Sequence, residues 1–341
     1  MISVKPYEQN RLNMFFSIIT PVTRPELVKE TAKALAAQSF KDFEVFYVSD
    51  IKVNQENTET IIENDLNPAL RRNIASLRAN GEYLVFLDDD AVPHEKWLER
   101  AFQIIQENKN IDALGGPDLL RSTAEFPERL TNVLLSHKVM GSGVKAHQED
   151  PQEGIVKDPS SLALCNLFIK KEVFIKLGGL NEGIGYGGED TELMHRVLKN
   201  HTAFFSPDLY VFHKKRDFGL PYFKQRFKFR FNNGKLLLAF PSMYLSNKKF
   251  LAFVIVGLVF LALLLTKPLI AANIFAIYLI IGTIFTIPYL NKDKRYIILP
   301  ICFALQHTTY YVGLLLGVLS AFNWKKIINI RKHNSCLKSA V

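Results

Sequence analysis

Cysteine is scarce in this chain of 341 residues, which contains three: Cys165, Cys302 and Cys336. Their spacing fits neither a metal site nor a disulfide framework, which argues against a disulfide-stabilised secreted domain and favours a reducing compartment. The N-terminus lacks the basic-then-apolar run of a secretory signal, and the apolar stretch at 14–19 is too short to be one. We therefore expect the soluble part of the chain to stay in the cytoplasm.

Charged side chains are absent from three stretches near the C-terminus, Phe250–Leu265, Pro268–Leu290 and Tyr296–Phe322. A buried core helix usually keeps one polar face, whereas these stretches are apolar all round and close to bilayer-spanning length. We predict about three transmembrane helices over 249–322, followed by a basic tail at 323–341. The number of full crossings stays open, because the first stretch is short and the third contains a polar run.

The formal charge of +9 fits a nucleic acid, an anionic membrane or an anionic substrate as partner. The position of the charge favours the membrane, since eight basic residues and one acid precede the first hydrophobic stretch. We expect membrane lipids and no nucleic acid as partners, and a multi-pass location in the inner or plasma membrane. The eight residues are Lys214, Lys215, Arg216, Lys224, Arg226, Lys228, Arg230 and Lys235.

Strand and helix patterns alternate over the first 216 residues. They predict an α/β fold, a Rossmann-like and mostly parallel sheet flanked by helices, in a catalytic domain at 1–216. A basic amphipathic juxtamembrane segment at 217–248 follows it, and 122–159 is interpreted as an irregular surface insertion. The main predicted strands are 14–20, 43–49, 83–87, 162–169, 203–206 and 209–213, and the main helices are 25–38, 68–79, 95–106, 171–177 and 189–199.

Three consecutive carboxylates, Asp88, Asp89 and Asp90, end the third predicted strand. Ligands of an open parallel sheet collect at the carboxyl ends of its strands, so Asp50, after the second strand, is expected in the same crevice. The charges would repel one another if unpaired, and their oxygens suit Mg²⁺ or Mn²⁺ held together with substrate phosphates. The alternative is a solvated acidic turn that only ends the strand.

Glu189 and Asp190 follow a glycine-rich segment that ends with Gly187 and Gly188. Such glycine density disfavours regular structure and predicts a mobile loop. The strand order can return this pair to the acidic crevice, where Asp190 is a candidate general base and the loop would exclude water on closing. The alternative is an ordinary acidic first turn of a helix.

Phenylalanines recur at helical spacing over 222–231, with Arg226 and Arg230 on the adjacent stripe. This pattern predicts an amphipathic helix at a membrane interface. The helix is either a lipid-facing anchor or also supplies cations that neutralise a departing diphosphate. His213 ends a predicted strand, where it faces the crevice or has a structural role.

Three groups of residues occur together between 14 and about 216. They are Ser17-Ile18-Ile19-Thr20-Pro21 with Arg24-Pro25-Glu26; Arg72-Asn73 with Gly81-Glu82-Tyr83-Leu84-Val85-Phe86-Leu87-Asp88-Asp89-Asp90; and Gly187-Gly188-Glu189-Asp190. In this order they resemble the family 2 glycosyltransferases with the GT-A fold. The third group is similar to the loop that carries the catalytic base of that family.

The resemblance implies a direct displacement in which the acceptor oxygen attacks the anomeric carbon opposite the leaving diphosphate, so configuration inverts. It assigns Asp50 to the nucleotide base, and Asp88 to the nucleotide sugar or diphosphate. Together with the crevice argument, it gives the full candidate site: donor-binding Thr20, Pro21, Asp50, Arg72, Asp88 and Asp89; metal ligands Asp90 and Asp88; base Asp190 beside Glu189; and His213, Arg226, Arg230, Gly187 and Gly188 on the diphosphate or acceptor side.

We therefore expect an inverting glycosyltransferase that uses a nucleotide-diphosphate sugar and a lipid-linked or cell-envelope glycan acceptor. A UDP-sugar is the first candidate for the donor. Processive family members carry Gln-x-x-Arg-Trp near the membrane, which Gln225-Arg226-Phe227 matches only loosely, so extended polymer synthesis is not expected. Two alternatives stay open: a metal-dependent nucleotidyl- or phosphotransferase at the membrane, and a non-catalytic scaffold that binds nucleotide sugar.

Overall fold

The computed structural model describes residues 14–56, 58–184, 186–245 and 247–321, and these form two compact units. Unit 1 is made of residues 14–122 and 145–214, and unit 2 of residues 123–144 and 215–321. Residues 123–144 therefore belong to unit 2, although they lie in the sequence between the two segments of unit 1. The predicted boundary near residue 216 stays a prediction, as does the basic tail at 323–341, which lies outside the described residues.

Unit 1 contains the strands and most of the short helices. In chain order its elements are β1 (Phe16–Pro21), α1 (Val28–Ala36), β2 (Phe43–Ser49), β3 (Glu59–Ile62), α2 (Pro68–Arg78), β4 (Tyr83–Leu87), β5 (Ala91–Pro93), α3 (Trp97–Glu107), β6 (Ala113–Gly115), β7 (Asp118–Leu119), η1 (Lys145–His147), β8 (Gly154–Ile155), η2 (Pro159–Ser161), β9 (Asn166–Lys170), α5 (Lys171–Lys176), α6 (Glu189–Val197), β10 (Ala203–Phe205) and β11 (Val211–His213).

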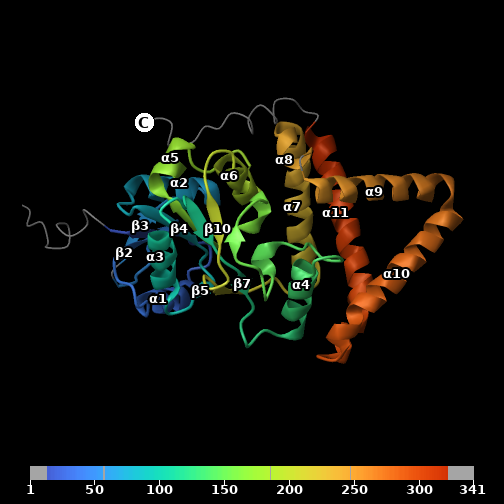
Figure 1. The fold of residues 1–341 in the computed structure, drawn as a ribbon, viewed down its shortest axis with the longest axis horizontal. Helices are drawn as coiled ribbons and strands as arrows, with labels where there is room; N and C mark the ends of the chain where they lie inside the picture. The colour runs from blue at the N-terminus through green and yellow to red at the C-terminus, as the bar shows by residue number, and fades with distance from the viewer. Residues whose placement is uncertain (1–13, 57, 185, 246, 322–341) are drawn as a thin grey trace, which may run out of the picture. The chain divides into compact units, whose positions relative to one another are not determined.

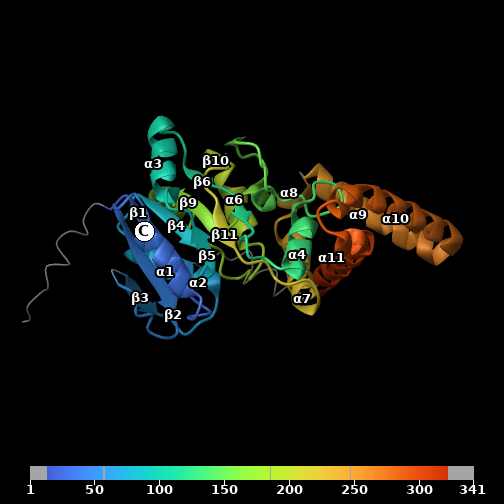
Figure 2. The same cartoon turned by 90° about the horizontal axis from the view of Figure 1, so that it is seen from below.

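The main sheet of unit 1, in the residues described, has eight strands in the order β3-β2-β1-β4-β9-β6-β10-β8. The first four run parallel, and β9 runs antiparallel to both of its neighbours, β4 and β6. β6 therefore points the same way as β4, and β10 continues parallel to β6. This arrangement confirms the predicted α/β class with a mostly parallel sheet flanked by helices (Figures 1 and 2).

Alternation along the strands builds a hydrophobic core on each face of this sheet. In β4, Leu84 and Phe86 join one cluster of buried residues, while Tyr83, Val85 and Leu87 join the other. Helices α2, α5 and α6 contribute to the first cluster, and α1 and α3 to the second. Because successive side chains of a strand point to opposite faces, a strand covered on both sides reads as a continuous apolar run.

One side chain of helix α2 fixes the carboxyl ends of the first three strands. The guanidinium of Arg71 is fully buried and donates to four backbone carbonyls, those of Val22 (2.6 Å), Val48 (3.4 Å), Glu63 (2.9 Å) and Asp65 (2.8 Å). These carbonyls follow β1, end β2 and follow β3. One arginine thus satisfies backbone groups at the carboxyl ends of three neighbouring strands, which would otherwise be buried without partners.

A small second sheet extends the same edge of unit 1. Its order is β5-β11-β7, with β11 antiparallel to β5 and parallel to β7. In this register His213 lies opposite Ala91, the residue that follows the acidic triplet. Asp118 pairs with Val211 on the other side of β11. Segments more than 90 residues apart in the sequence are therefore brought beside the end of β4.

Unit 2 is helical. Its elements are α4 (Phe126–Ser136), α7 (Leu220–Ala239), α8 (Pro241–Leu245), α9 (Lys248–Thr266), α10 (Pro268–Leu290), η3 (Lys294–Ile298) and α11 (Leu299–Ala321). α7 and α11 pack against each other at close range, because a Cβ added to Gly317 would lie 2.1 Å from the carbonyl oxygen of Phe231. Likewise, a Cβ on Gly234 would lie 2.4 Å from the carbonyl oxygen of Leu314.

Among the described residues, three helical stretches of unit 2 are long and apolar enough to cross a membrane: Lys248–Thr266, Pro268–Leu290 and Lys294–Ala321. They coincide with the three charge-free stretches of the sequence. α9 and α10 leave most of their apolar side chains uncovered by the rest of the chain. An exposed apolar surface of this extent is typical of helices that face lipid.

The structure corrects the prediction of an irregular surface insertion at 122–159. Residues 126–136 form the helix α4, and its side chains Leu130, Leu134 and Leu135 are buried in a cluster with α11 residues such as Phe303. The apolar residues at i and i+4, preceded by Pro127 in the first turn, carried the helical signal that the surrounding polar residues obscured. The strand β3 was also missed, because it is only four residues long.

We expect Arg71→Met to lower the free energy of unfolding by about 3 kcal/mol, since it leaves buried carbonyls without donors. The measurement is thermal unfolding of the purified full-length chain in detergent. Arg78→Met is the matched control on the same helix, because 57% of the Arg78 side chain is exposed and its ion pair with Glu59 spans 3.8 Å. Equal melting temperatures for the two variants would contradict this role.

Candidate active site

The acidic triplet occupies the edge of the main sheet to which β1, β2 and β4 point. β4 ends at Leu87 and its parallel neighbours end beside it, so Asp88 and Asp50 follow strands at the same edge. The two carboxylates differ in exposure: the Asp50 side chain is 51% exposed and that of Asp88 is 33% exposed. Each of the three acids of the triplet has different partners.

Asp89 holds the turn that follows β1. Its Oδ2 accepts from the backbone N–H groups of Thr23 and Arg24, both at 2.8 Å, and from the Thr23 hydroxyl at 3.1 Å. The Arg24 guanidinium donates to Oδ1 at 2.8 Å. Asp89 is nearly fully buried. The middle carboxylate of the triplet therefore fixes the shape of the site, and its predicted contact with the donor stays a prediction.

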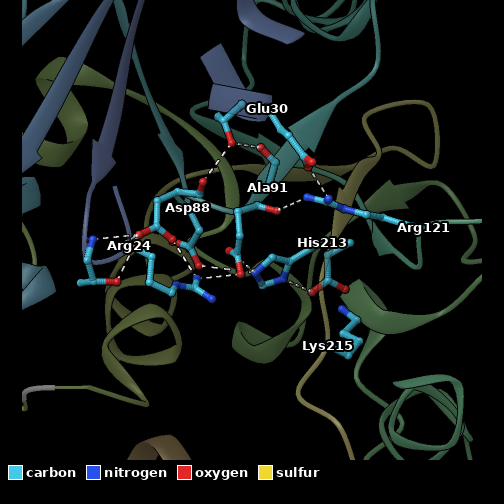
Figure 3. A network of polar contacts seen from close by, with 12 residues as sticks. Arg24, Glu30, Asp88, Ala91, Arg121, His213 and Lys215 are labelled. Atoms are coloured by element: carbon cyan, nitrogen blue, oxygen red, sulfur yellow. Dashed lines mark hydrogen bonds and ion pairs between the residues drawn. The ribbon is translucent and has the colours of Figure 1, made fainter. Parts of the chain in front are cut away.

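Asp90 faces a histidine and an arginine. Its Oδ1 lies 3.0 Å from His213 Nε2 and its Oδ2 lies 2.6 Å from Arg24 Nη2. Figure 3 labels both of these partners, His213 and Arg24, within the surrounding polar network. Burial by itself would raise the pKa of Asp90, but the contacts with His213 and Arg24 outweigh it and hold the pKa well below its usual range. Asp90 therefore stays a carboxylate, and Arg121 fixes its backbone by donating to the Asp90 carbonyl at 3.0 Å.

Asp88 pairs with the other arginine of α2. The guanidinium of Arg72 donates to Asp88 Oδ1 at 2.7 Å, while Asp88 Oδ2 lies 3.9 Å from His213 Nε2. Burial raises the pKa of Asp88, and the positive charges of Arg72 and His213 oppose that shift. The ligand atoms of Asp88, Asp90 and His213 all lie within 4.8 Å of one another.

The charge of Arg72 also acts on the acidic pair at the start of α6. Burial raises the pKa of both Glu189 and Asp190, and in each case the Arg72 charge acts in the opposite direction. The pair lies about 100 residues downstream of the triplet, so this electrostatic effect on it is a tertiary feature. Predicted site residues from two distant segments therefore lie within the electrostatic range of one guanidinium.

The two acids of α6 have different surroundings. Glu189 is buried and its Oε2 accepts from the N–H of Gly187 at 2.6 Å. Burial and repulsion from Asp190 raise the pKa of Glu189 to about 7. Asp190 is half-buried and accepts from the N–H of Thr191 at 2.7 Å. Gly187 and Gly188 have φ of 101° and 108°, a backbone region that other residues rarely adopt.

Asparagines of α2 hold the glycine-rich segment in place, a role that the sequence reasoning missed. Asn73 accepts from the N–H of Leu180 and donates to its carbonyl, both at 2.9 Å, and also donates to the Glu182 carboxylate at 2.7 Å. Asn67 donates to the Glu182 carbonyl at 2.9 Å. The first part of the predicted mobile loop is therefore tied to the helix that carries Arg72.

A second group missed by the sequence reasoning lies behind His213. Asp118 is 2% exposed, and its Oδ2 lies 3.5 Å from His213 Nδ1. Its Oδ1 lies 2.7 Å from His147 Nδ1, and the buried Cys165 donates its thiol to Oδ2 at 3.8 Å. Burial lowers the pKa of His213, but Cys165, Asp118 and Asp90 outweigh it and raise that pKa well above its usual value.

The residues around His213 fit a divalent cation. Asp88 and Asp90 offer hard carboxylate oxygens and His213 offers an imidazole nitrogen, a donor set that suits Mn²⁺ and leaves positions for phosphate oxygens. In the structure Arg24 and Arg72 balance the negative charge. Asp118, Cys165 and His213 form a second group with ligand atoms inside 4.8 Å.

The remaining predicted residues are placed as follows. Thr20 and Pro21 lie in β1 and are buried, so the exposed surface of this turn comes from Thr23 and Arg24 instead. Arg226 and Arg230 lie on α7 in unit 2. There the Arg226 guanidinium lies 4.5 Å from the Phe229 ring centroid, and that of Arg230 lies 4.2 Å from the Tyr310 ring centroid. Their predicted role at a diphosphate stays a prediction.

Comparison with known protein families decides the identity of the main domain. Residues 17–138 match the model of the glycosyl transferase family 2. This part of the chain is similar to the family 2 glycosyltransferase domain. Residues 155–217 match the model described as the N-terminal domain of galactosyltransferase. The two matches contain the acidic triplet, the glycine-rich segment, Asp190 and His213, in the order expected from the sequence.

Individual relatives of this chain are distant in sequence. An uncharacterized glycosyltransferase of Haemophilus influenzae is 28% identical over 193 residues, which cover 54% of this chain and 62% of the relative. Glycosyltransferase AglE of Haloferax volcanii is 24% identical over 238 residues, which cover 65% of this chain and 73% of that protein. The match to the Haemophilus protein therefore spans less than two thirds of its length.

One solved structure shows the shared fold. The mannosyltransferase PcManGT from Pyrobaculum calidifontis, in complex with GDP-Man and Mn²⁺, has a TM-score of 0.54 and 16% sequence identity. The alignment covers 91% of this chain and 87% of that one. The likeness confirms the predicted GT-A-like α/β class of the glycosyltransferase domain.

The pKa of Glu189 gives a prediction for stability. Folding raises the pKa of the Glu189 carboxyl from 4.5 to about 7. The folded protein therefore becomes less stable as the pH rises through this interval, because the folded state opposes the ionisation of Glu189. We expect Glu189→Gln to raise the melting temperature at pH 8 and to leave it nearly unchanged at pH 4.5. The gain at pH 8 is at most about 3 kcal/mol, at 1.36 kcal/mol per pKa unit. A larger gain at the acidic end would contradict the shift.

Proposed function

We propose that this chain transfers a sugar from a nucleotide-diphosphate donor, a UDP-sugar in the first instance, to a lipid-linked or cell-envelope glycan acceptor, with inversion at the anomeric carbon. The observation that carries the proposal is the position of Arg72. It pairs with Asp88 at 2.7 Å and acts electrostatically on Glu189 and Asp190. The charge of one guanidinium thereby acts on both the donor-side and the acceptor-side carboxylates.

The donor diphosphate fits the groups beside the triplet. Arg72 is nearly fully buried and, within the part of the chain described, its Nε has no hydrogen-bond partner. Such an orphaned donor is expected to bind a ligand oxygen. Asp88, Asp90 and His213 would hold Mg²⁺ or Mn²⁺, which supplies positive charge to the leaving diphosphate. The mannosyltransferase of the same fold, solved with GDP-Man and Mn²⁺, supports this reading.

Asp190 is the proposed general base. Deprotonating an acceptor hydroxyl needs a carboxylate within hydrogen-bond reach of it, and Asp190, which is not fully buried, keeps surface for that contact. Glu189, buried beside it, is fixed by the Gly187 N–H and serves to shape the turn. The acceptor oxygen then attacks opposite the leaving diphosphate in a single displacement, so no covalent intermediate is involved.

The acceptor class is inferred from unit 2. Three apolar helices and the basic, aromatic α7 belong to one unit of this chain, which favours a lipid-linked acceptor on the cytoplasmic face of the cell membrane. Membrane lipids are then partners of α9 and α10.

The two other readings of the acidic site predict different products. A nucleotidyl- or phosphotransferase would use the metal-binding carboxylates but would leave Asp190 without a role. It would release pyrophosphate or transfer a phosphate, whereas a glycosyltransferase releases a nucleoside diphosphate. A non-catalytic scaffold would bind the donor and release nothing.

We expect the full-length chain to release a nucleoside diphosphate from at least one member of a panel of UDP- and GDP-linked sugars. Release should require Mg²⁺ or Mn²⁺ and stop on chelation, because two carboxylates and an anionic diphosphate repel each other without a cation. Binding of each donor is followed in parallel by a thermal shift. The proposal is wrong if the chain neither binds nor hydrolyses any donor.

We expect Asp190→Asn to lower kcat/KM by about 100- to 10,000-fold, the usual contribution of a general base, with donor affinity retained. The measurement is initial-rate kinetics combined with donor binding by calorimetry. Asp208→Asn is the control, because Asp208 forms an exposed ion pair with Arg100 (3.0 Å) outside the site. Full activity in the Asp190 variant would assign the base to another residue.

A further inference from the structure

The small sheet of unit 1 places a buried carboxylate beside the proposed metal ligand His213. β11 lies between β5 and β7, and its register sets Asp118 opposite Val211, two residues before His213. Side chains two residues apart on a strand point to the same face. Asp118 and His213 therefore lie on one face of neighbouring strands, and their closest atoms, Asp118 Oδ2 and His213 Nδ1, are 3.5 Å apart.

Asp118 is itself held from two other sides. His147, on the short helix η1, contacts its Oδ1 at 2.7 Å, and the Cys165 thiol, before β9, approaches its Oδ2 at 3.8 Å. The carboxylate is 2% exposed, so none of these contacts competes strongly with water. Three segments of unit 1 thus converge on the carboxylate of Asp118.

The two nitrogens of His213 face opposite ways. Nδ1 faces Asp118, while Nε2 faces Asp90 at 3.0 Å and Asp88 at 3.9 Å. A carboxylate can only accept, so in the structure a proton on Nδ1 is shared with Asp118 and a proton on Nε2 with Asp90. A cation held by Asp88 and Asp90 would replace the second of these protons, so that Nδ1 keeps its proton and the lone pair of the ring belongs to Nε2. That nitrogen points to the two carboxylates proposed to hold the cation.

We propose that Asp118 is a positioning residue that fixes the tautomer and the ring orientation of His213 so that Nε2 binds the divalent cation. The inference rests on the proposed function, because it assumes a metal held by Asp88, Asp90 and His213. A metal-binding histidine usually donates its other N–H to a carboxylate or carbonyl, and removing that partner typically lowers metal affinity by about 10- to 100-fold. Asp118 has no direct contact with the cation in this arrangement.

The proposal predicts a loss of affinity with a spectroscopic signature. We expect Asp118→Asn, in the full-length protein in detergent, to raise the Kd for Mn²⁺ by about 10- to 100-fold. Mn²⁺ alone is the probe, titrated by electron paramagnetic resonance. Pulsed measurements on the bound ion should show ¹⁴N coupling from histidine in the unaltered chain, and weaker or absent coupling in the variant.

Two further variants control for a merely structural effect. Asp112→Asn removes another carboxylate–histidine pair of unit 1, that of Asp112 with His201 at 3.0 Å, which lies before β6 at the opposite edge of the sheet. It should leave Mn²⁺ affinity and ¹⁴N coupling unchanged. His147→Gln loosens Asp118 without touching His213, and should raise the Kd by a smaller factor even where Asp118→Asn does not fold.

The outcomes separate this inference from the proposed function. If the unaltered chain binds Mn²⁺ with ¹⁴N coupling and both the Asp118 and His147 variants do the same, the positioning role is overturned while the metal site stands. If the unaltered chain binds no Mn²⁺, the metal-dependent function fails first. If X-ray absorption on the Zn²⁺-loaded chain shows a sulfur ligand, Asp118, Cys165 and His213 form a separate metal site, which also overturns the inference.

Discussion

Three consecutive residues of one helix determine how the site of this protein is assembled. Successive side chains of an α-helix point about 100° apart, so Arg71, Arg72 and Asn73 leave α2 in three directions. Arg71 holds the ends of the first strands, Arg72 meets Asp88, and Asn73 binds the glycine-rich segment. The acidic edge of the sheet and the start of α6 are therefore positioned by the same rigid element.

The three carboxylates of the acidic triplet also have different roles. Asp89 is used entirely by the turn after β1, whereas Asp88 and Asp90 face Arg72, Arg24 and His213. Arg24, Arg72 and His213 between them contact all three acids of this run, and each acid lies within 3.0 Å of at least one of them. Mutual repulsion, which suggested a metal from the sequence, is a weaker argument than the donor set that the fold assembles around His213.

Local patterns predicted much of the fold and the acidic part of the site. Strands such as β4 are continuous apolar runs, and Asp88 and Asp190 stand at recognisable positions in motifs. What could not be predicted depends on long-range pairing. The contact of Asp118 with His213 comes from the alignment of β7, two residues long, with β11, and no periodicity marks a strand of that length. The helix α4 was missed for a different reason, since polar residues on both sides obscured the helical spacing of the apolar residues that it packs against α11.

The burial of Arg72 has a consequence for affinity. A free arginine side chain gives up about 2 kcal/mol of rotamer entropy when a ligand immobilises it. In this chain that loss has already occurred during folding, because Arg72 is only 4% exposed and is aligned by Asp88. A phosphate oxygen that meets this guanidinium finds it preorganised, so more of the contact energy appears as binding and less is spent on ordering the protein.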